Sequence, residues 1–192
     1  MSHAPVERTI SKKSWRVDVV DQHSTVIDFV KRWHYAKGGP NTSTYRHGLY
    51  SVNGEREWGV TLWLPPTKIA AQSVAHDDWK GVLCLSRLAV HPLAPKNAAS
   101  FLLGASMRMI NRDRWPVLLT YADTRLGHTG AIYKATNWEC LGEVKAGDVW
   151  IAPDGSQAGR KRGKFSYTRD QMIDMGYVKA PSAPKIKYVH RA

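Results

Sequence analysis

The sequence has few of the features that mark membrane, secreted or zinc-binding proteins. It contains no run of about 18 apolar residues, the length that a membrane-spanning helix needs, and its N-terminus has no apolar signal core. The two cysteines, Cys84 and Cys140, lie far apart and form no CxxC pair, which is typical of a reducing compartment and argues against a cysteine zinc site. We therefore expect a soluble protein that acts in the cytoplasm, away from membranes.

Acidic residues are also scarce. Sixteen Asp and Glu stand against 28 Lys and Arg, which gives a formal net charge of +12 and an isoelectric point near 9.9. A field of this size attracts polyanions, so nucleic acid is the expected partner. Residues 155–192 carry nine Lys or Arg against two Asp and are a candidate phosphate-binding segment. The alternative is a solvated basic tail that only keeps the protein in solution.

Hydrophobic patterning predicts an α/β protein. Helical spacing indicates helices over residues 25–33, with Ser24 as N-cap, and over 96–110. Strands are expected at 15–20, 49–52, 58–64, 82–90, 117–121 and 138–144. This order is typical of a mixed sheet with helices on both faces. We expect a flexible basic N-terminus (1–14), one catalytic domain (15–154) and a basic C-terminal extension (155–192) that packs on the same domain.

The segment from Tyr121 to Glu143 is the first candidate for a functional site. An apolar strand ends at Asp123, a Gly-His turn and a short helix over 129–136 follow, and an aromatic strand returns. A strand end that opens onto a helix is where α/β sheets usually bind ligands. A second candidate is the loop over residues 34–45, which is rich in Gly, Pro, Asn, Thr and Tyr.

The element order resembles the GNAT acetyltransferase fold, in which a central strand leads into a helix whose N-terminal amides hold the pyrophosphate of acetyl-CoA. Here the segment VLCLSRLAVHPLAPKNAASFLLGA occupies that position. Free backbone N–H groups and the helix dipole make such an end a site for anions. The sequence departs from the family at the turn, because Pro95 to Ser100 replaces the usual glycine-rich segment and glycine permits close backbone approach.

More specifically, the chain resembles the Mom family of bacteriophage DNA adenine modification enzymes. The matching residues keep their order along most of the chain between 30 and 190. They are Trp33-His34-Tyr35, Leu85-Ser86-Arg87, Lys96-Asn97 with Ser100, Ala122-Asp123, Gly127-His128, Gly130, Ile132-Tyr133, Ala135, Asn137-Trp138, Gly142 and Lys185-Ile186-Lys187-Tyr188.

The resemblance implies that the protein replaces an N6 hydrogen of adenine in duplex DNA with a carbamoylmethyl group, which protects phage DNA from restriction in the host cytoplasm. We expect a pocket formed by loop 34–45 and the strand ends around Ser86, Arg87 and Asp123. The resemblance marks His34, Tyr35 and Asp123 as catalytic, and Ser86 and Tyr133 are further catalytic candidates. His34 would move protons near neutral pH, Asp123 would orient it or accept a proton from the amine, and Tyr133 would donate to an oxyanion.

The same resemblance implies a CoA thioester, acetyl-CoA or a relative, as cofactor. Lys96, Asn97 and Ser100 would face its phosphates, and Arg87, if it points into the pocket, would bind either a phosphate or a carboxylate through two parallel hydrogen bonds. Acyl transfer alone joins the adenine nitrogen to a carbonyl carbon, whereas the family product joins it to a methylene carbon. A redox metal has therefore been considered for the family, and His34 with Asp123 would supply two ligands of an iron.

Duplex DNA buries the amino group of adenine, so the base has to leave the stack, and aromatic side chains can receive it. Such side chains are available at Trp33, Tyr35, Tyr45, Tyr133 and Trp138. The predicted DNA contacts are Tyr45, Arg160, Lys161, Arg162, Lys164, Lys185 and Lys187.

Two other functions fit the sequence. One is an acetyl-CoA-dependent N-acetyltransferase that acts on a protein or a small amine. The other is a DNA-binding protein without enzymatic activity. The oligomeric state is open, and a homodimer is compatible with the sequence.

Overall fold

The computed structural model describes residues 9–124, 127–145, 148–162, 164–181 and 183–192, without the side chain of Arg162. Its helices are α1 (His23–Trp33), α2 (Lys68–Gln72), α3 (Ala98–Arg108), α4 (Ala131–Lys134) and α5 (Arg169–Asp174), with a 3₁₀ turn at Trp79–Gly81. Its longer strands are β1 (Trp15–Val19), β2 (Tyr45–Ser51), β3 (Gly59–Leu64), β4 (Val82–Val90), β5 (Val117–Asp123), β6 (Glu139–Val144) and β12 (Lys185–Arg191). No helix in these ranges is long and apolar enough to cross a membrane.

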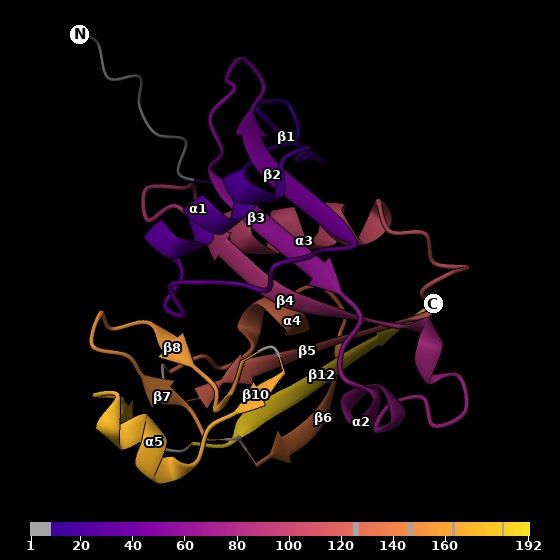
Figure 1. The fold of residues 1–192 in the computed structure, drawn as a ribbon. Helices are drawn as coiled ribbons and strands as arrows, with labels where there is room; N and C mark the ends of the chain where they lie inside the picture. The colour runs from indigo at the N-terminus through magenta and orange to yellow at the C-terminus, as the bar shows by residue number, and fades with distance from the viewer. Residues whose placement is uncertain (1–8, 125–126, 146–147, 163, 182) are drawn as a thin grey trace, which may run out of the picture.

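These seven strands form one sheet in the order β1-β2-β3-β4-β5-β12-β6 (Figure 1). All neighbours run antiparallel except β4 and β5, which are parallel. The apolar run Val82 to Val90 forms the central strand β4, as its composition predicts for a strand covered on both faces. The mixed α/β architecture expected from the sequence is therefore present.

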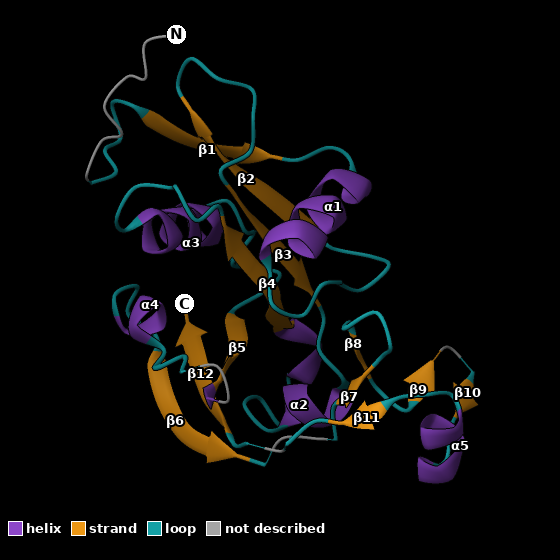
Figure 2. Ribbon diagram, turned by 90° about the vertical axis from the view of Figure 1, so that its left-hand side faces the viewer, coloured by secondary structure: helices purple, strands orange, loops and turns teal. Residues whose placement is uncertain are grey.

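Helices cover both faces of the sheet (Figure 2). On one face α1 buries Val26 and Val30, one helical turn apart, against Val60, Leu62 and Ala89. On the other face the core contains Leu103 of α3 and Tyr133 of α4. We call these the α1 face and the α3 face.

Between β6 and β12 the chain leaves the sheet and forms an arm, residues 150–179. The arm contains α5 and the short strands β7 (Trp150–Ile151), β8 (Gln157–Ala158), β9 (Lys161–Arg162), β10 (Phe165–Ser166) and β11 (Val178–Lys179). Trp150 and Met172 are fully buried. In Figure 2 the arm stands on the side of the sheet that carries α1, opposite α3 and α4.

Several predicted boundaries differ from the structure. Helix α1 begins at His23 and has Gln22 at its N-cap position, so the predicted cap at Ser24 is wrong. Helices α3 and α4 are shorter than expected, because the residues next to each end lie outside the helix. Residues 185–191, which the sequence analysis placed in the basic extension, form β12 between β5 and β6. The boundary at 154/155 stays a prediction.

Candidate active site

The site begins where the two middle strands of the sheet separate. Strands β4 and β5 pair over only three residues, from Val82 with Val117 to Cys84 with Leu119, although both continue beyond. On the β3 side of β4, Trp63 lies opposite Leu85 and Leu62 opposite Arg87, so Ser86 is the extra residue of a β-bulge. A bulge bends its strand and redirects side chains. The separation and the bulge together leave an opening in the middle of the sheet.

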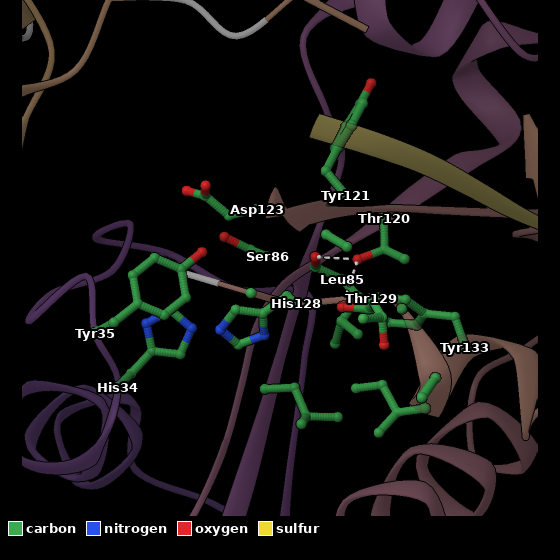
Figure 3. A pocket seen from close by; sticks show the side chains of 16 residues that line it. His34, Tyr35, Leu85, Ser86, Thr120, Tyr121, Asp123, His128, Thr129 and Tyr133 are labelled. Atoms are coloured by element: carbon green, nitrogen blue, oxygen red, sulfur yellow. Dashed lines mark hydrogen bonds between the residues drawn. The ribbon is translucent and has the colours of Figure 1, made fainter. Parts of the chain in front are cut away.

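A cavity of about 300 Å³ occupies this opening (Figure 3). It brings together four of the five predicted catalytic side chains on β4, β5 and the end of α1, and Tyr133 of α4 joins them from the other side. Its wall consists of His34, Tyr35, Leu85, Ser86, Leu88, Thr120, Tyr121, Ala122, Asp123 and residues 127–133. The predicted catalytic residues therefore share one cavity; their roles remain predictions.

The two faces of the sheet contribute different groups to the cavity. Side chains alternate along β5, and Leu118 and Ala122 lie in the α3-face core, so Asp123 and Tyr121 point to the α1 face. Asp123 is the last residue of β5 and is 7% exposed. His34 and Tyr35, which follow α1, approach from the same face, whereas Thr120 and Tyr133 lie on the α3 face. The Asp123 carboxylate and the His34 imidazole are thus on one side of the cavity, and the Tyr133 phenol is on the other.

The end of α1 fixes the His34 ring. The His34 N–H donates to the carbonyl of Val30 at 2.9 Å, and the N–H of Ala36 donates to His34 Nδ1 at 3.1 Å. Burial, followed by the positive charge of Arg87 and the proximity of His128, lowers the pKa of His34 from 6.5 to about 4. His34 is therefore neutral at pH 7 and carries its proton on Nε2. The expectation that it titrates near neutral pH is wrong, and His34 presents a hydrogen-bond donor.

Three rings form a row at the edge of the cavity. The ring of Tyr35 stacks on His34, with centroids 4.2 Å apart and planes at 29°, and lies 5.6 Å from the ring of His128 (Figure 3). Tyr35 is 37% exposed. Flat, partly exposed rings of this kind can stack on a planar ligand.

Tyr133 and Thr120 form the polar part of the α3 side. The Thr120 hydroxyl donates to the carbonyl of Leu85 at 3.3 Å and lies 3.4 Å from the Tyr133 hydroxyl. Burial raises the pKa of Tyr133 to about 12, so the phenol is neutral at physiological pH. The sequence analysis missed Thr120; a hydroxyl within the apolar run of β5 was the available signal.

Arg87 does not line the cavity. Its Nε donates to the carbonyl of Gly38 at 2.7 Å, and one terminal nitrogen donates to the carbonyl of Ser86 at 2.7 Å. Burial lowers its pKa. The guanidinium thus connects loop 34–45 to the bulge. A charged side chain on a buried strand needs polar partners, and these two carbonyls provide them. Its predicted contact with cofactor phosphates has no support in this arrangement.

A second hollow, of about 450 Å³, lies at the N-terminus of α3 and shares Ala131 and Ile132 with the cavity. Asn97 and Ser100 line it, and Lys96 lies exposed beside it. Asn97 has φ 68°, the left-handed conformation that glycine and asparagine adopt most readily, and no described side chain caps the helix. Asparagine therefore provides the backbone geometry for which a glycine was expected, and the helix end can accept an anion.

His34 and Asp123 lie in the same cavity, as an iron site would require. Within the described residues, however, no group of three or more His, Cys, Asp or Glu side chains is placed to hold a metal ion. The iron stays a prediction without a complete ligand set.

The predicted DNA-binding residues fall into two groups. Arg160, Lys161 and Lys164 are exposed on the arm, and the side chain of Arg162 lies outside the described part. The others are on the sheet: Tyr45 is half-buried at the start of β2, Lys185 lies opposite Asp123, and Lys187 Nζ donates to Ser73 Oγ at 3.0 Å. Tyr45 packs against the core, as does the buried Trp138. Among the described side chains of these two groups, the arm thus presents three exposed cations, Arg160, Lys161 and Lys164.

The Mom protein family has a model that matches residues 14–172. A methylcarbamoylase of Escherichia phage Mu, Mom, is 27% identical over 115 residues, which are 57% of this chain and 46% of that protein. The matched region thus spans less than half the length of this relative.

Two solved acetyltransferase structures share the fold of this chain. A ribosomal-protein-S5-alanine acetyltransferase from Vibrio fischeri aligns with a TM-score of 0.55 and 8% identity, covering 95% of this chain and 96% of the other. A Bacillus subtilis acetyltransferase in complex with CoA aligns with a TM-score of 0.52 and 8% identity, covering 93% and 99%. At this identity the likeness concerns the fold, and the predicted GNAT-like fold is confirmed.

Proposed function

Because the chain belongs to the Mom protein family, we propose that it is a transferase that converts adenine in duplex DNA to N6-carbamoylmethyl adenine and so protects phage DNA from restriction. One observation carries this proposal: His34, Tyr35, Ser86 and Asp123, which come from three separate segments, line a single cavity. The net charge of +12 supports a polyanionic substrate. The phage relative is itself named a methylcarbamoylase.

We propose that the adenine enters from the α1 face. Asp123 and His34 lie on that side, and the stacked ring of Tyr35 offers a flat surface to an extruded base. The Asp123 carboxylate accepts the proton that the N6 amine loses when it bonds to the methylene carbon. Because that bond replaces a C–H bond when the donor is an acetyl group, the step also requires a two-electron oxidant. The neutral His34 donates its Nε2 proton in a hydrogen bond and orients the base or the incoming group.

On the α3 side we propose a CoA thioester. The hollow at Asn97 and Ser100 fits its phosphates, because the helix N-terminus is open and the hollow continues into the cavity through Ala131 and Ile132. When bound, a CoA thioester supplies an activated acyl group. The neutral Tyr133 phenol is placed to donate a hydrogen bond to a carbonyl oxygen on that side. The nitrogen of the carbamoyl group requires a further donor.

The proposal predicts the effect of Asp123→Asn. The amide keeps the shape of the side chain but cannot accept the proton at neutral pH, so modification should fall by about 100-fold or more while DNA affinity changes little. The measurement is mass spectrometry of nucleosides from the DNA of cells that express each variant. Asp77→Asn, which changes an exposed carboxylate that does not line the cavity, is the matched control. Wild-type amounts of modified adenine in the Asp123→Asn sample would refute the assignment.

The acetyltransferase alternative has support from the fold and from the CoA complex among the related structures. It predicts release of CoA from acetyl-CoA in the presence of an amine and the absence of DNA. The DNA-binding alternative predicts that Asp123→Asn and His34→Ala leave every measurable activity intact. One set of assays, nucleoside analysis and CoA release with and without DNA, separates the three functions.

A further inference from the structure

The arm contains a two-stranded ribbon with an exposed phenyl ring. In β9 and β10, Phe165 pairs with Arg162 and Ser166 with Lys161, and the Tyr167 N–H donates to the carbonyl of Arg160 at 2.9 Å. The Phe165 side chain is 71% exposed, whereas Trp33 and Tyr35 are each 37% exposed. The ribbon therefore holds an aromatic side chain in water on a backbone fixed by strand pairing.

Stability does not account for Phe165. Burying a phenylalanine side chain stabilises a fold, and most of that gain is absent at this exposure. The neighbouring sequence is otherwise hydrophilic: residues 157–170 contain five Lys or Arg and one Asp. A phenyl ring among positive charges suits a partner that is anionic on its outside and apolar within, which describes duplex DNA.

The ribbon is on the side from which the substrate base would come. Asp123, His34 and Tyr35 reach the cavity from the α1 face, and the arm stands on the same side of the sheet (Figure 2). A two-stranded ribbon is narrow enough to enter the major groove of DNA. Arg160, Lys161 and Lys164 are exposed on and beside it and can contact phosphates.

We propose that Phe165 is a wedge that enters the base stack next to the target adenine and occupies the space that the base leaves when it turns into the cavity. The inference rests on the proposed function, since a wedge is needed only if a base leaves the duplex. Extruding a base loses stacking and pairing. An inserted aromatic ring restores stacking to the neighbouring bases, which offsets much of that cost. Phe165 is thus a positioning residue that contacts neighbouring base pairs and leaves the chemistry to the cavity.

The test compares Phe165→Ala with Val178→Ala, which removes another exposed apolar side chain, 68% exposed on β11 of the same arm. The DNA is a duplex whose sequence the wild-type chain modifies, with the target adenine replaced by 2-aminopurine, which brightens when it leaves the stack. We expect Phe165→Ala to reduce the fluorescence gain about 10-fold at saturating protein, with at most a threefold change in Kd. Val178→Ala should match wild type in both measurements.

A second duplex carries a pyrene nucleotide opposite the target position. Pyrene fills the space of a base pair, so it should restore extrusion by Phe165→Ala to within about threefold of wild type. Equal fluorescence gains for wild type and Phe165→Ala would overturn the wedge. A loss of DNA affinity in Phe165→Ala that pyrene does not rescue would also overturn the wedge, because Phe165 would then be a docking contact for DNA. A change in oligomeric state would overturn it as well, because Phe165 would then be a docking contact for protein.

The two proposals fail in different ways. If wild-type protein produces modified adenine and Phe165→Ala produces the same amount, the wedge is wrong and the DNA modification activity stands. If wild type yields neither modified adenine nor a fluorescence gain on any duplex, the proposed function is wrong and the wedge falls with it. A fluorescence gain without modified adenine would leave the wedge standing and overturn the assigned chemistry.

Discussion

Gly127 and Gly130 offer a matched pair of substitutions at the edge of the cavity. Both have left-handed backbones, with φ of 71° and 72°. A Cβ added at Gly127 would meet no described atom within 4 Å, whereas a Cβ at Gly130 would overlap the ring and hydroxyl of Tyr188, with Cε2 only 2.6 Å away. Alanine at both positions therefore carries the same backbone strain, and only one of them adds a clash.

The expected magnitudes follow from this difference. An alanine in the left-handed conformation destabilises the folded state by about 1–2 kcal/mol. Alanine also lowers the conformational entropy of the unfolded chain, which offsets roughly half of this cost. Gly127→Ala should therefore lower the free energy of unfolding by about 1 kcal/mol. Tyr188 cannot move aside easily, because it is 1% exposed, its ring is 5.0 Å from that of Tyr133 and its hydroxyl donates to the carbonyl of Thr129. Overpacking adds about 1–3 kcal/mol, which gives roughly 2–4 kcal/mol for Gly130→Ala.

The measurement is urea denaturation followed by tryptophan fluorescence, with the slope of the transition checked for each variant. Gly130→Ala should also reduce activity, because any shift of Tyr188 is transmitted to Thr129 and Tyr133 at the cavity. Equal destabilisation by the two substitutions would refute the reasoning, since it would mean that Tyr188 does not pack against Gly130.

Three further predictions concern stability and binding. Burial lowers the pKa values of His34 and His47 from 6.5 to about 4, so the unfolded chain binds more protons than the folded chain in this pH range. The free energy of unfolding should therefore fall by up to about 3 kcal/mol per histidine as the pH drops from 6.5 to 4. Urea titrations of wild type and His47→Gln across this pH range test the prediction. Ser106→Ala should lower the free energy of unfolding by about 2–4 kcal/mol in the same assay, because the buried Ser106 hydroxyl forms hydrogen bonds with His47, Thr61 and Trp63 at 2.7, 3.0 and 2.8 Å. Ser73→Ala, at an exposed serine, is the control. A decrease of less than about 1 kcal/mol for Ser106→Ala would contradict the importance of this network. Replacing Arg160, Lys161 and Lys164 of the arm with Gln should weaken DNA binding. The slope of log Kd against log salt concentration should fall by about 0.9 for each phosphate that the variant no longer neutralises. An unchanged slope would exclude phosphate binding by these three residues.

The sequence predicted the elements that bury a continuous apolar surface. Val82 to Val90 forms β4 with the predicted bounds because a strand covered on both faces is apolar throughout. The bulge at Ser86 could not be predicted, because it depends on the register with β3. The alternation of Lys185 and Lys187 with Ile186 and Tyr188 was a strand signal, but the positive charge of the segment favoured an exposed tail.

The candidate site was predictable where residue type and family pattern agreed. His34 and Asp123 were both selected from the sequence, and the structure brings them into one cavity. The low pKa of His34 depends on its burial, and the position of its proton depends on the hydrogen bond from the Ala36 N–H. Neither can be deduced from the sequence pattern. Arg87 was assigned to the pocket by its place in β4, but the position of its guanidinium is set by Gly38, 49 residues away in the chain.

The position of β12 has a consequence for synthesis. Strand β5, which ends at Asp123, has its outer edge covered by residues 185–191, and β6 has no other neighbour in the sheet order than β12. The ribosome adds about 60 residues between Asp123 and Lys185, which takes roughly 3–12 s at 5–20 residues per second. Throughout that interval the strand that carries the candidate catalytic carboxylate is an open sheet edge, able to pair with another nascent chain. The completed arm must therefore emerge before β12 can cover the edge of the strand that ends at Asp123.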